Sequence, residues 1–386
     1  MSKEIYFDNN ATTKTSPEVL QEMLPYFSEY YGNPSSAHSF GGGVAKKIAV
    51  AKEKIAFLLG ADSIEEIIVT SCGSESDNTA INSAILSFPE KKHIVTTKVE
   101  HPAVLNYCKY LSGTGYRITF LDVDSLGRID LKELEKSLTD ETAIASVMWA
   151  NNETGTVFPI EKISEIVKSK GVLFHTDAVQ AAGKINIDLK KSHIDMLSIS
   201  GHKLHSPKGI GVLYLKKNTP FKPFLIGGHQ ENGLRAGTEN AASIIGLGKA
   251  AELAKKHIEY ENSEVKRLRD KLETALKNNI RLVKINGDID NRLPNTLNIS
   301  FKNVEGEAVL LYMNEKKICA STGSACATGS LEPSHVLMAM SVPYEYAHGS
   351  IRFSLSRYNT EEEVDEVVKI MPEIIEKLRA MSPFKD

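Results

Sequence analysis

The sequence of 386 residues lacks the features of a secreted or membrane protein. No apolar run approaches the roughly 18 residues that a membrane-spanning helix needs, and the opening stretch MSKEIYFDNN has no apolar core of the kind found in signal peptides. Few cysteines in a chain of this length are typical of free thiols in a reducing compartment. The cysteines are Cys72, Cys108, Cys319 and Cys326, with no C-x-x-C pair. We therefore expect a cytoplasmic protein with no membrane contact and no zinc site built from cysteine alone.

A strong charge of either sign is also lacking. The chain has 46 Lys and Arg against 49 Asp and Glu, a formal net charge of −3, and no block or stripe of basic residues. Nucleic acid is therefore not an expected partner, since its binding needs a concentrated positive surface. The hydrophobic fraction of 41% and the charged fraction of 25% are ordinary for a soluble globular protein. The length predicts about two to three domains.

Short apolar runs alternate with amphipathic stretches, which predicts β-α-β units and a mostly parallel sheet. The predicted strands are residues 65–71, 92–98, 142–149, 171–177, 195–200 and 211–215. Residues 43–60 carry apolar side chains at helical spacing, and Gly60 is positioned to end that helix. A long helical stripe runs from Ile258 to Leu276.

Beyond that stripe the pattern changes. It predicts a strand at 295–301, a helix at 306–314, a strand at 349–357 and a final helix that begins with a capping box of Thr360 and Glu363. We therefore place a boundary near residue 256. A large α/β domain would span 13–256, and a smaller α+β domain would comprise 1–12 and 257–386.

A lysine at the mouth of a predicted strand is the first candidate for chemistry. The strand ends at Ser200, and Lys203 follows between imidazoles in the segment SGHKLHSPKGIG. Such a lysine is either a Schiff-base nucleophile or an ordinary surface-loop residue. Another predicted strand runs into Asp177, and Gln180 comes three residues later. A carboxylate there would keep a pyridinium nitrogen protonated, or it would cap the next helix.

Other strand ends carry weaker signals. Gly73, Ser74 and Ser76 stand at a predicted helix start, where backbone N–H groups and hydroxyls favour a phosphate. His101 follows a strand and precedes a proline, and it is either a catalytic or a loop residue. The glycine-rich stretch 227–240 is either a substrate- or subunit-facing loop or a long connection.

Taken together, these segments resemble the cysteine desulfurases of the NifS/IscS type, within the class V aminotransferase family. The resemblance covers nearly the whole chain through the motifs YFDNNATT, YGNPSSAH, VEHPAV, ANNETG, HTDAVQ, SGHKLH, GLRAGTEN, STGSACATGSLEPSHVL and IRFSLSR. It implies the α/β fold of fold-type I, aspartate aminotransferase-like enzymes, with a mixed, mostly parallel sheet in the large domain. It also implies a homodimer that binds pyridoxal 5′-phosphate and acts on L-cysteine.

The resemblance assigns roles to individual residues. The catalytic residues that it implies are Lys203, Cys326 and His101. The implied cofactor-binding residues are Gly73, Ser74, His101, Asn152, Asp177, Gln180, Ser200, His202, Lys203 and Thr238, the last from the second subunit. The implied substrate-binding residues are Asn33, Asn152 and Arg352. Arg352 would pair with the substrate carboxylate in the bidentate manner of guanidinium groups, unless it forms an ion pair within the small domain.

Cys326 stands in a run of very small residues, STGSACATGS, between Ser321 and Ser330. Small residues favour a mobile loop, which we expect at about 319–333, and fit a buried structural thiol poorly. The resemblance implies that Cys326 attacks the substrate sulfur as a thiolate, holds it as a persulfide and passes it on. The acceptor would be a scaffold protein of iron–sulfur cluster assembly, similar to NifU or IscU, and Cys326 itself would be a transient cluster ligand.

Two other cysteines and several rival functions complete the expectations. Cys72 replaces a glycine that is frequent at this turn in the family and is interpreted as a small buried filler, while Cys319 is the better candidate for a packed thiol.

The rival functions are selenocysteine lyase, a class V aminotransferase, and a non-catalytic protein that binds a sulfur acceptor. The sequence does not separate general cluster assembly from nitrogenase maturation or tRNA thiolation.

Overall fold

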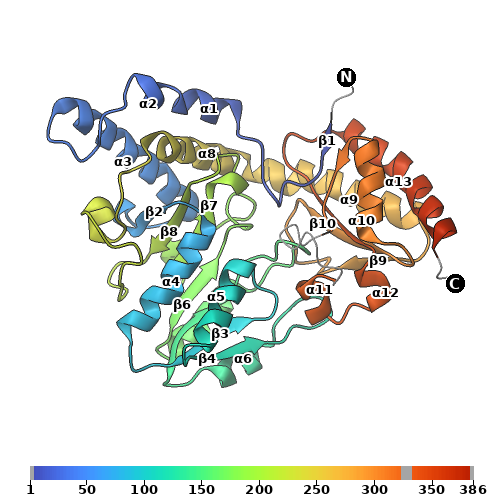
Figure 1. The fold of residues 1–386 in the computed structure, drawn as a ribbon, viewed down its shortest axis with the longest axis horizontal. Helices are drawn as coiled ribbons and strands as arrows, with labels where there is room; N and C mark the ends of the chain where they lie inside the picture. The colour runs from blue at the N-terminus through green and yellow to red at the C-terminus, as the bar shows by residue number, and fades with distance from the viewer. Residues whose placement is uncertain (1–3, 323–332, 383–386) are drawn as a thin grey trace.

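The protein is described by a computed structural model that covers residues 4–322 and 333–382 (Figure 1). Its main feature is a seven-stranded sheet with the order β2-β8-β7-β6-β5-β3-β4. The strands are β2 (Ile67–Thr70), β3 (His93–Thr97), β4 (Arg117–Leu121), β5 (Thr142–Ser146), β6 (Leu173–Asp177), β7 (Met196–Ser200) and β8 (Gly211–Leu215). Strand β8 is antiparallel to both of its neighbours, and the other pairs are parallel. The sheet is therefore mixed and mostly parallel, as the sequence predicted.

Helices cover both faces of this sheet. On β2, Ile67 and Val69 join one hydrophobic cluster and Ile68 joins another. The first cluster includes residues of α3 (Ser39–Leu59), α7 (Ile160–Ser169) and α8 (Ala241–Tyr260), and the second includes residues of α4 (Gly73–Ser87) and α5 (Pro102–Ser112). Because successive side chains of a strand point to opposite faces, strands covered on both faces are nearly continuous apolar runs. That is why the sequence reveals them.

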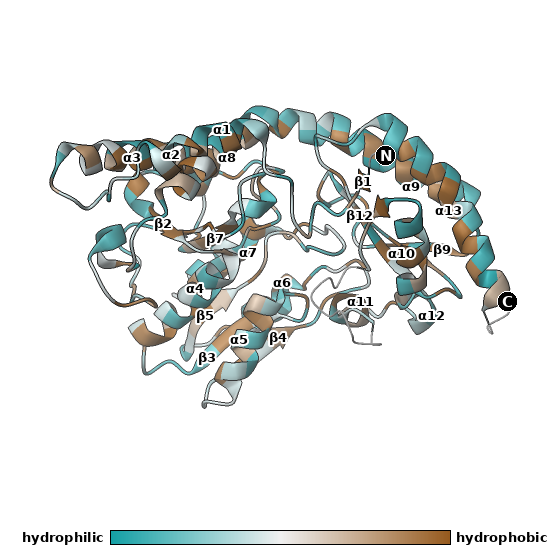
Figure 2. Cartoon of the chain, turned by 45° about the horizontal axis from the view of Figure 1, so that its top comes forward, coloured by the Kyte–Doolittle hydropathy of each residue, from teal (hydrophilic) through white to brown (hydrophobic). Residues whose placement is uncertain are grey.

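A smaller antiparallel sheet has the order β12-β10-β9. Its strands are β9 (Val283–Asn286), β10 (Thr296–Phe301) and β12 (Ser350–Ser354). It shares a separate hydrophobic cluster with α9 (Lys266–Asn279), α10 (Gly306–Glu315) and α13 (Glu361–Met381). Strand β1 (Ile5–Tyr6) pairs in parallel with β11 (Ile318–Cys319) and adds Ile5 to that cluster. Figure 2 shows polar and apolar residues alternating along α9 and α13, as expected for helices with one buried face.

One long helical segment connects the two sheets (Figure 1). Helix α8 continues into a π-helical turn, Glu261–Val265, and then directly into α9. The helix therefore runs through residue 256, where the sequence led us to divide the chain. In addition, α11 (His335–Ala339) and α12 (Tyr344–Ala347), which come late in the sequence, contribute to the cluster of the large sheet. The division into two domains at this residue stays a prediction.

Two helix ends follow the signals in the sequence. Helix α3 ends at Leu59, and Gly60 takes the left-handed conformation with φ 65°. At the start of α13, the Thr360 side chain accepts from the Glu363 N–H and the Glu363 carboxylate accepts from the Thr360 N–H. Both predictions are confirmed. The sequence did not reveal β4 and β9, whose residues are mostly half-buried.

The remaining elements are short. They are helices α1 (Pro17–Met23), α2 (Pro25–Ser28) and α6 (Leu131–Ser137), and 3-10 turns at Ile64–Glu66, Leu189–Lys191, Gly201–Lys203 and Gln230–Gly233. In the part of the chain that the structure describes, no helix combines the length and low polarity that crossing a bilayer requires.

Candidate active site

A cavity of about 590 Å³ lies where strand ends of the large sheet meet β12 of the small sheet. Its volume is within the range of about 300–1,000 Å³ that is usual for small-molecule sites. The predicted residues that line it are Gly73, Ser74, His101, Asn152, Asp177, Gln180, Ser200, His202, Lys203 and Arg352. The fold therefore brings together residues that are up to 279 positions apart in the sequence, the separation between Gly73 and Arg352.

Lys203 is held at the end of β7 by a single 3-10 turn. Its Nζ donates to the backbone carbonyl oxygens of Asn10, at 2.5 Å, and Ala11, at 2.7 Å. Burial, together with the positive charges of Arg352 and Lys184, lowers the pKa of Lys203 to about 7. Near neutral pH, the Lys203 side chain is therefore a neutral amine in a large fraction of the molecules, and this is the form that acts as a nucleophile or base.

Asp177 ends the neighbouring strand, β6, and its Oδ1 accepts from the Val179 N–H at 2.8 Å. The carboxylate thus supports the turn after the strand and also lines the cavity. Burial raises the pKa of Asp177 to about 6, while the hydrogen bond from Val179 and the charge of Lys203 oppose the shift. Bringing a cation to this carboxylate would restore its charged form.

His101 caps the N-terminus of α5, where its Nδ1 accepts from the Ala103 N–H at 3.1 Å. An accepting Nδ1 carries no proton, so the proton of the neutral ring is on Nε2. Burial, and then the charges of Lys203 and His335, lower the pKa of His101 to about 4. The cavity therefore contains a neutral imidazole at physiological pH.

The start of α4 forms another wall of the cavity. A Cβ atom at Gly73 would meet Val179 Cγ2 at 2.9 Å, so glycine allows the close approach of this turn to the loop after β6. Ser74 and Ser200 lie at the same wall, and His202 contacts Thr12 Oγ1 through Nδ1 at 3.2 Å. The interpretation of Cys72 as a buried filler is wrong, because Cys72 is only half-buried and lines the cavity.

Arg352 reaches the cavity from the middle of β12. Its Nη2 forms an ion pair with Asp8 Oδ1 at 2.7 Å, and its Nη1 donates to the Asn152 carbonyl at 3.1 Å. The ion pair that the sequence left open is therefore present, and the side chain also faces the cavity. A buried guanidinium held by a carboxylate keeps its charge and its planar orientation.

This set of groups fits pyridoxal phosphate. The Lys203 amine would hold its aldehyde carbon, the Asp177 carboxylate its ring nitrogen, and the close-packed turn at Gly73 with Ser200 and His202 its phosphate. Burial raises the pKa of Asp177 to about 6, and a cationic ring nitrogen next to it would favour its charged form.

Two predicted residues that the structure describes do not line this cavity. Asn33 and Thr238 are exposed and are not among the residues that line it. Asn33 Oδ1 accepts from the Ser35 N–H at 2.9 Å within its own loop. Cys326 lies outside the described residues.

The cavity also contains residues that the sequence analysis did not single out: Asn10, Asp77, Glu153 and His335. The Glu153 carboxylate accepts from the Ser334 hydroxyl, and His335 Nε2 contacts the Glu100 carbonyl at 3.1 Å. Their motifs, ANNETG, VEHPAV and EPSHVL, were recognised as units, and only the fold shows which member of each reaches the cavity. Asn10 lies in the motif YFDNNATT, but its contact with Lys203 is made by its backbone carbonyl, which residue type does not reveal.

Glu100 lies close to this cavity, since its carbonyl contacts His335, and the effect of burial on its carboxyl group can be tested. Its carboxylate is fully buried, and it accepts from the Met148 N–H at 3.0 and 3.1 Å and from the Thr97 hydroxyl at 2.8 Å. Burial raises the pKa of Glu100 from 4.5 to about 8. Between these values the folded chain binds more protons than the unfolded chain, so the free energy of unfolding falls as pH rises, by up to about 1.4 kcal/mol per pH unit.

The variant Glu100→Gln has no proton to lose. We therefore expect its free energy of unfolding, relative to the wild type, to increase steadily as pH rises from about 5 to about 8. Urea titrations of both cofactor-free proteins at several pH values measure this difference. A difference that stays constant over the window would show that Glu100 is not protonated in the folded protein.

Comparisons with known proteins agree with this geometry. The sequence model of the class-V aminotransferases matches residues 5–367. A protein named cysteine desulfurase from Nostoc sp. is 60% identical over 382 residues, which cover 99% of this chain and 95% of the relative. Cysteine desulfurase NifS of Azotobacter vinelandii is 57% identical over 381 residues, with the same shares of the two chains covered.

Solved structures give the same result. A NifS-like protein with 41% identity superposes with a TM-score of 0.92 and covers 97% of this chain and 100% of its own. A NifS-like protein from Rickettsia africae, with 33% identity, has a TM-score of 0.87 and the same coverage. The fold is therefore the fold-type I architecture that the sequence predicted. The match to residues 5–367 and the identities near 60% over the full length show that the chain belongs to the class-V aminotransferase family.

Proposed function

We propose that this protein is a pyridoxal-phosphate-dependent cysteine desulfurase, which removes sulfur from L-cysteine and releases L-alanine. The observation that carries the proposal is the meeting of Lys203, Asp177, His101 and Arg352 in one cavity. Relatives with 55–60% identity over nearly the whole chain are named cysteine desulfurase.

Each side chain has a task that follows from its state. The neutral amine of Lys203 is able to bind the cofactor and, once displaced by the amino group of the substrate, to remove the proton from Cα. The Arg352 guanidinium binds the substrate carboxylate, and its ion pair with Asp8 shows that it takes a carboxylate partner. Pyridoxal phosphate supplies, when bound, an electron sink for the charge left at Cα. His101 stays neutral beside it and offers an Nε2 proton.

Cys326 completes the proposed reaction. Its thiolate attacks the substrate sulfur, an S–S bond forms, and the Cβ–S bond breaks with its electron pair left on carbon, which then takes a proton. The products are L-alanine and a persulfide on Cys326.

We propose that the persulfide sulfur passes to a scaffold protein of iron–sulfur cluster assembly, similar to NifU or IscU, in the cytoplasm. Cys326 is also proposed as a transient cluster ligand. Among residues 4–322 and 333–382 there is no group of three or more His, Cys, Asp and Glu side chains that could hold a metal ion.

We propose a homodimer as the functional state. Exposed large apolar side chains gather on the segment of α1, α2 and the loop that follows: Leu20, Leu24, Phe27, Tyr30 and Tyr31. Exposed apolar surface of this extent favours an interface. Thr238 and Asn33 are also exposed, which suits residues that would complete the cavity of a second subunit. A monomer in sedimentation that still binds the cofactor would contradict this assignment.

The test of the function is alanine release from L-cysteine by the protein loaded with cofactor, in the presence of a thiol reductant. We expect alanine and sulfide in equal amounts. If L-cysteine yields no alanine although the cofactor is bound, L-selenocysteine and amino-group acceptors are assayed next. Release of selenium alone would assign a selenocysteine lyase, and transfer of the amino group would assign an aminotransferase.

A further inference from the structure

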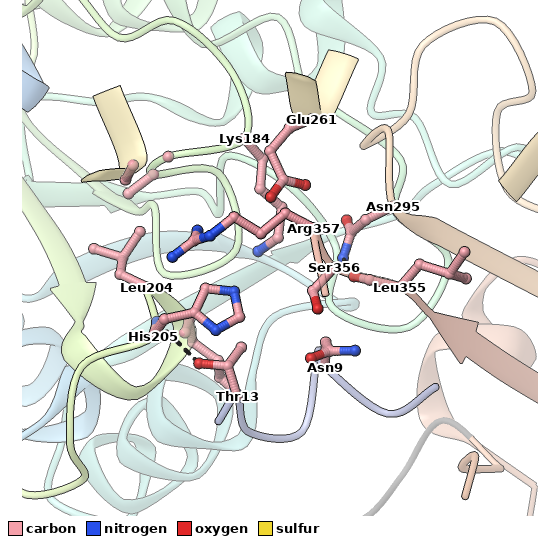
Figure 3. Close-up of a pocket in the computed structure, with 14 residues that line it drawn as sticks. Asn9, Thr13, Lys184, Leu204, His205, Glu261, Asn295, Leu355, Ser356 and Arg357 are labelled. Atoms are coloured by element: carbon pink, nitrogen blue, oxygen red, sulfur yellow. Dashed lines mark hydrogen bonds between the residues drawn. The ribbon is translucent and has the colours of Figure 1, made fainter. Parts of the chain in front are cut away.

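A second, much smaller cavity also borders Lys203. Its volume is about 20 Å³, enough for one water molecule, which needs roughly 10–15 Å³. Figure 3 shows the side chains of Lys184, Glu261, Arg357 and His205 converging on it. An ammonium, a guanidinium and a carboxylate therefore border the same small cavity as Lys203, at a place that the proposed reaction does not use.

Lys184 is fixed at the end of the turn that follows Asp177. Gly183 precedes it with φ 73°, and a Cβ atom there would meet Leu204 Cδ2 at 2.7 Å, so only glycine fits this bend. The side chain of Lys184 is buried, and its Nζ donates to the Gln180 carbonyl at 3.0 Å and to Gln180 Oε1 at 3.3 Å.

This contact determines the orientation of the Gln180 amide. An ammonium group only donates hydrogen bonds, so the oxygen of the amide must face Lys184. The Gln180 Nε2 then donates to the Asn10 carbonyl at 3.0 Å, the same carbonyl that accepts from Lys203 Nζ at 2.5 Å. A series of hydrogen bonds through the Gln180 side chain and the Asn10 carbonyl oxygen therefore links Lys184 to Lys203.

The long connecting helix supports Lys184 from the other side. In its π-helical turn, Asn262 Nδ2 donates to the Lys184 carbonyl at 2.7 Å, and the neighbouring Glu261 is buried against the small cavity. Burial raises the pKa of Glu261, and the charges of Lys184 and Arg357 oppose this shift. Burial lowers the pKa of Lys184 to about 8, and the charge of Glu261 opposes that shift in turn. A buried ammonium needs such a counter-charge to keep its proton, and π-helical turns often occur where a functional residue must be placed.

Several charged and titratable groups face the two lysines. Those that act on Lys203 are Arg352, Lys184, Asp8, Asp177, His101 and His202. Those around Lys184 are Glu261, Lys203, His202, His205 and Arg357. Arg352 and Lys184 are the two groups of this set that disfavour a charge on Lys203 most strongly. Arg352 also lines the proposed substrate site, whereas Lys184 does not border that cavity.

We propose that Lys184, supported by Glu261 and Asn262, is a positioning residue of the active site: it orients the amide of Gln180 and, as an ammonium group, places a positive charge near Lys203. The inference rests on the proposed function for the reaction that Lys203 serves. The position of the charge itself is independent of which substrate is used.

The test uses the full-length protein with bound cofactor, and the variants Lys184→Met and Lys184→Arg. The pH titration of the visible absorbance of the cofactor reports when the Lys203 nitrogen binds a proton. We expect the midpoint to rise by about one pH unit in Lys184→Met and to return close to the wild-type value in Lys184→Arg, which keeps the charge. The matched control is Lys191→Met, because this lysine is 84% exposed and only seven positions further along the chain. Its midpoint should not move.

A second measurement does not need the cofactor, so it also applies to a variant that no longer binds it. The reactivity of Lys203 toward an amine-acylating reagent, measured across pH by peptide mass spectrometry on the cofactor-free chain, gives its titration directly. If Lys184→Met does not fold, Lys184→Gln replaces it in both measurements.

An unchanged Lys203 titration in a folded, uncharged variant would overturn the proposal. Failure of the proposed function gives a different result. A wild-type protein without alanine release, but with the shift in Lys184→Met, would reject the desulfurase and retain the role of Lys184.

Discussion

Replacing Lys203 with alanine is expected to lower alanine release from L-cysteine by at least about 10³-fold, because one change removes both the nucleophile that holds the cofactor and the base that takes the Cα proton. The structure gives the reason for expecting both roles. The amine is held by two backbone carbonyls, and burial and neighbouring cations lower its pKa to about 7. The measurement is alanine release together with the visible absorbance of the bound cofactor.

The matched control is Lys208→Ala, five positions along the same loop and exposed. This variant should keep the activity and the absorbance of the wild type. Added methylamine should restore part of the activity of Lys203→Ala, since a small amine is able to enter the space that the side chain leaves. A Lys203→Ala variant with activity within about tenfold of the wild type would exclude Lys203 as the base, because general base catalysis contributes roughly 10²–10⁴-fold.

The meeting of Asp177 and Lys203 could be predicted because Asp177 ends one buried strand and Lys203 follows another that runs parallel to it. Strands β6 and β7 are neighbours, with Asp177 opposite Ser198 in the register, so residues just beyond their ends must lie near each other. His101 comes after β3, which is separated from β6 by β5, and it lines the same cavity. The apolar runs show in the sequence where these strands end, and the reactive side chains lie at or just beyond those ends.

Other parts of the site depend on contacts that no local pattern encodes. The Asn10 carbonyl accepts from Lys203 across a sequence separation of 193 positions, and a backbone oxygen leaves no trace in residue type. The burial of Glu261 against Lys184 requires that the long helix continue through the point where the sequence suggested a domain boundary. Thr238 stays a prediction, because a single chain does not contain the second subunit whose cofactor it would bind, and Asn33 stays a prediction because it does not line the cavity of its own chain.

Replacing Cys326 with alanine is expected to abolish steady alanine release, because the variant has no thiolate to accept the substrate sulfur. The cofactor should remain bound, since the residues proposed to hold it are all elsewhere in the chain. Peptide mass spectrometry gives a second reading. After brief exposure to L-cysteine, the wild-type peptide that contains Cys326 should gain one sulfur atom that a reductant removes, and the variant should gain none at any position.

The other cysteines make this test selective. Burial raises the pKa of Cys108 to about 12 and raises the pKa of Cys319, so both stay thiols and neither is a nucleophile at neutral pH. Cys72 is the one described cysteine that lines the cavity, and Cys72→Ala is therefore the control that matters. We expect Cys72→Ala to retain activity and to accumulate persulfide on Cys326. The opposite pattern, with sulfur on Cys72 and an active Cys326→Ala, would transfer the role of the nucleophile to the turn that begins α4.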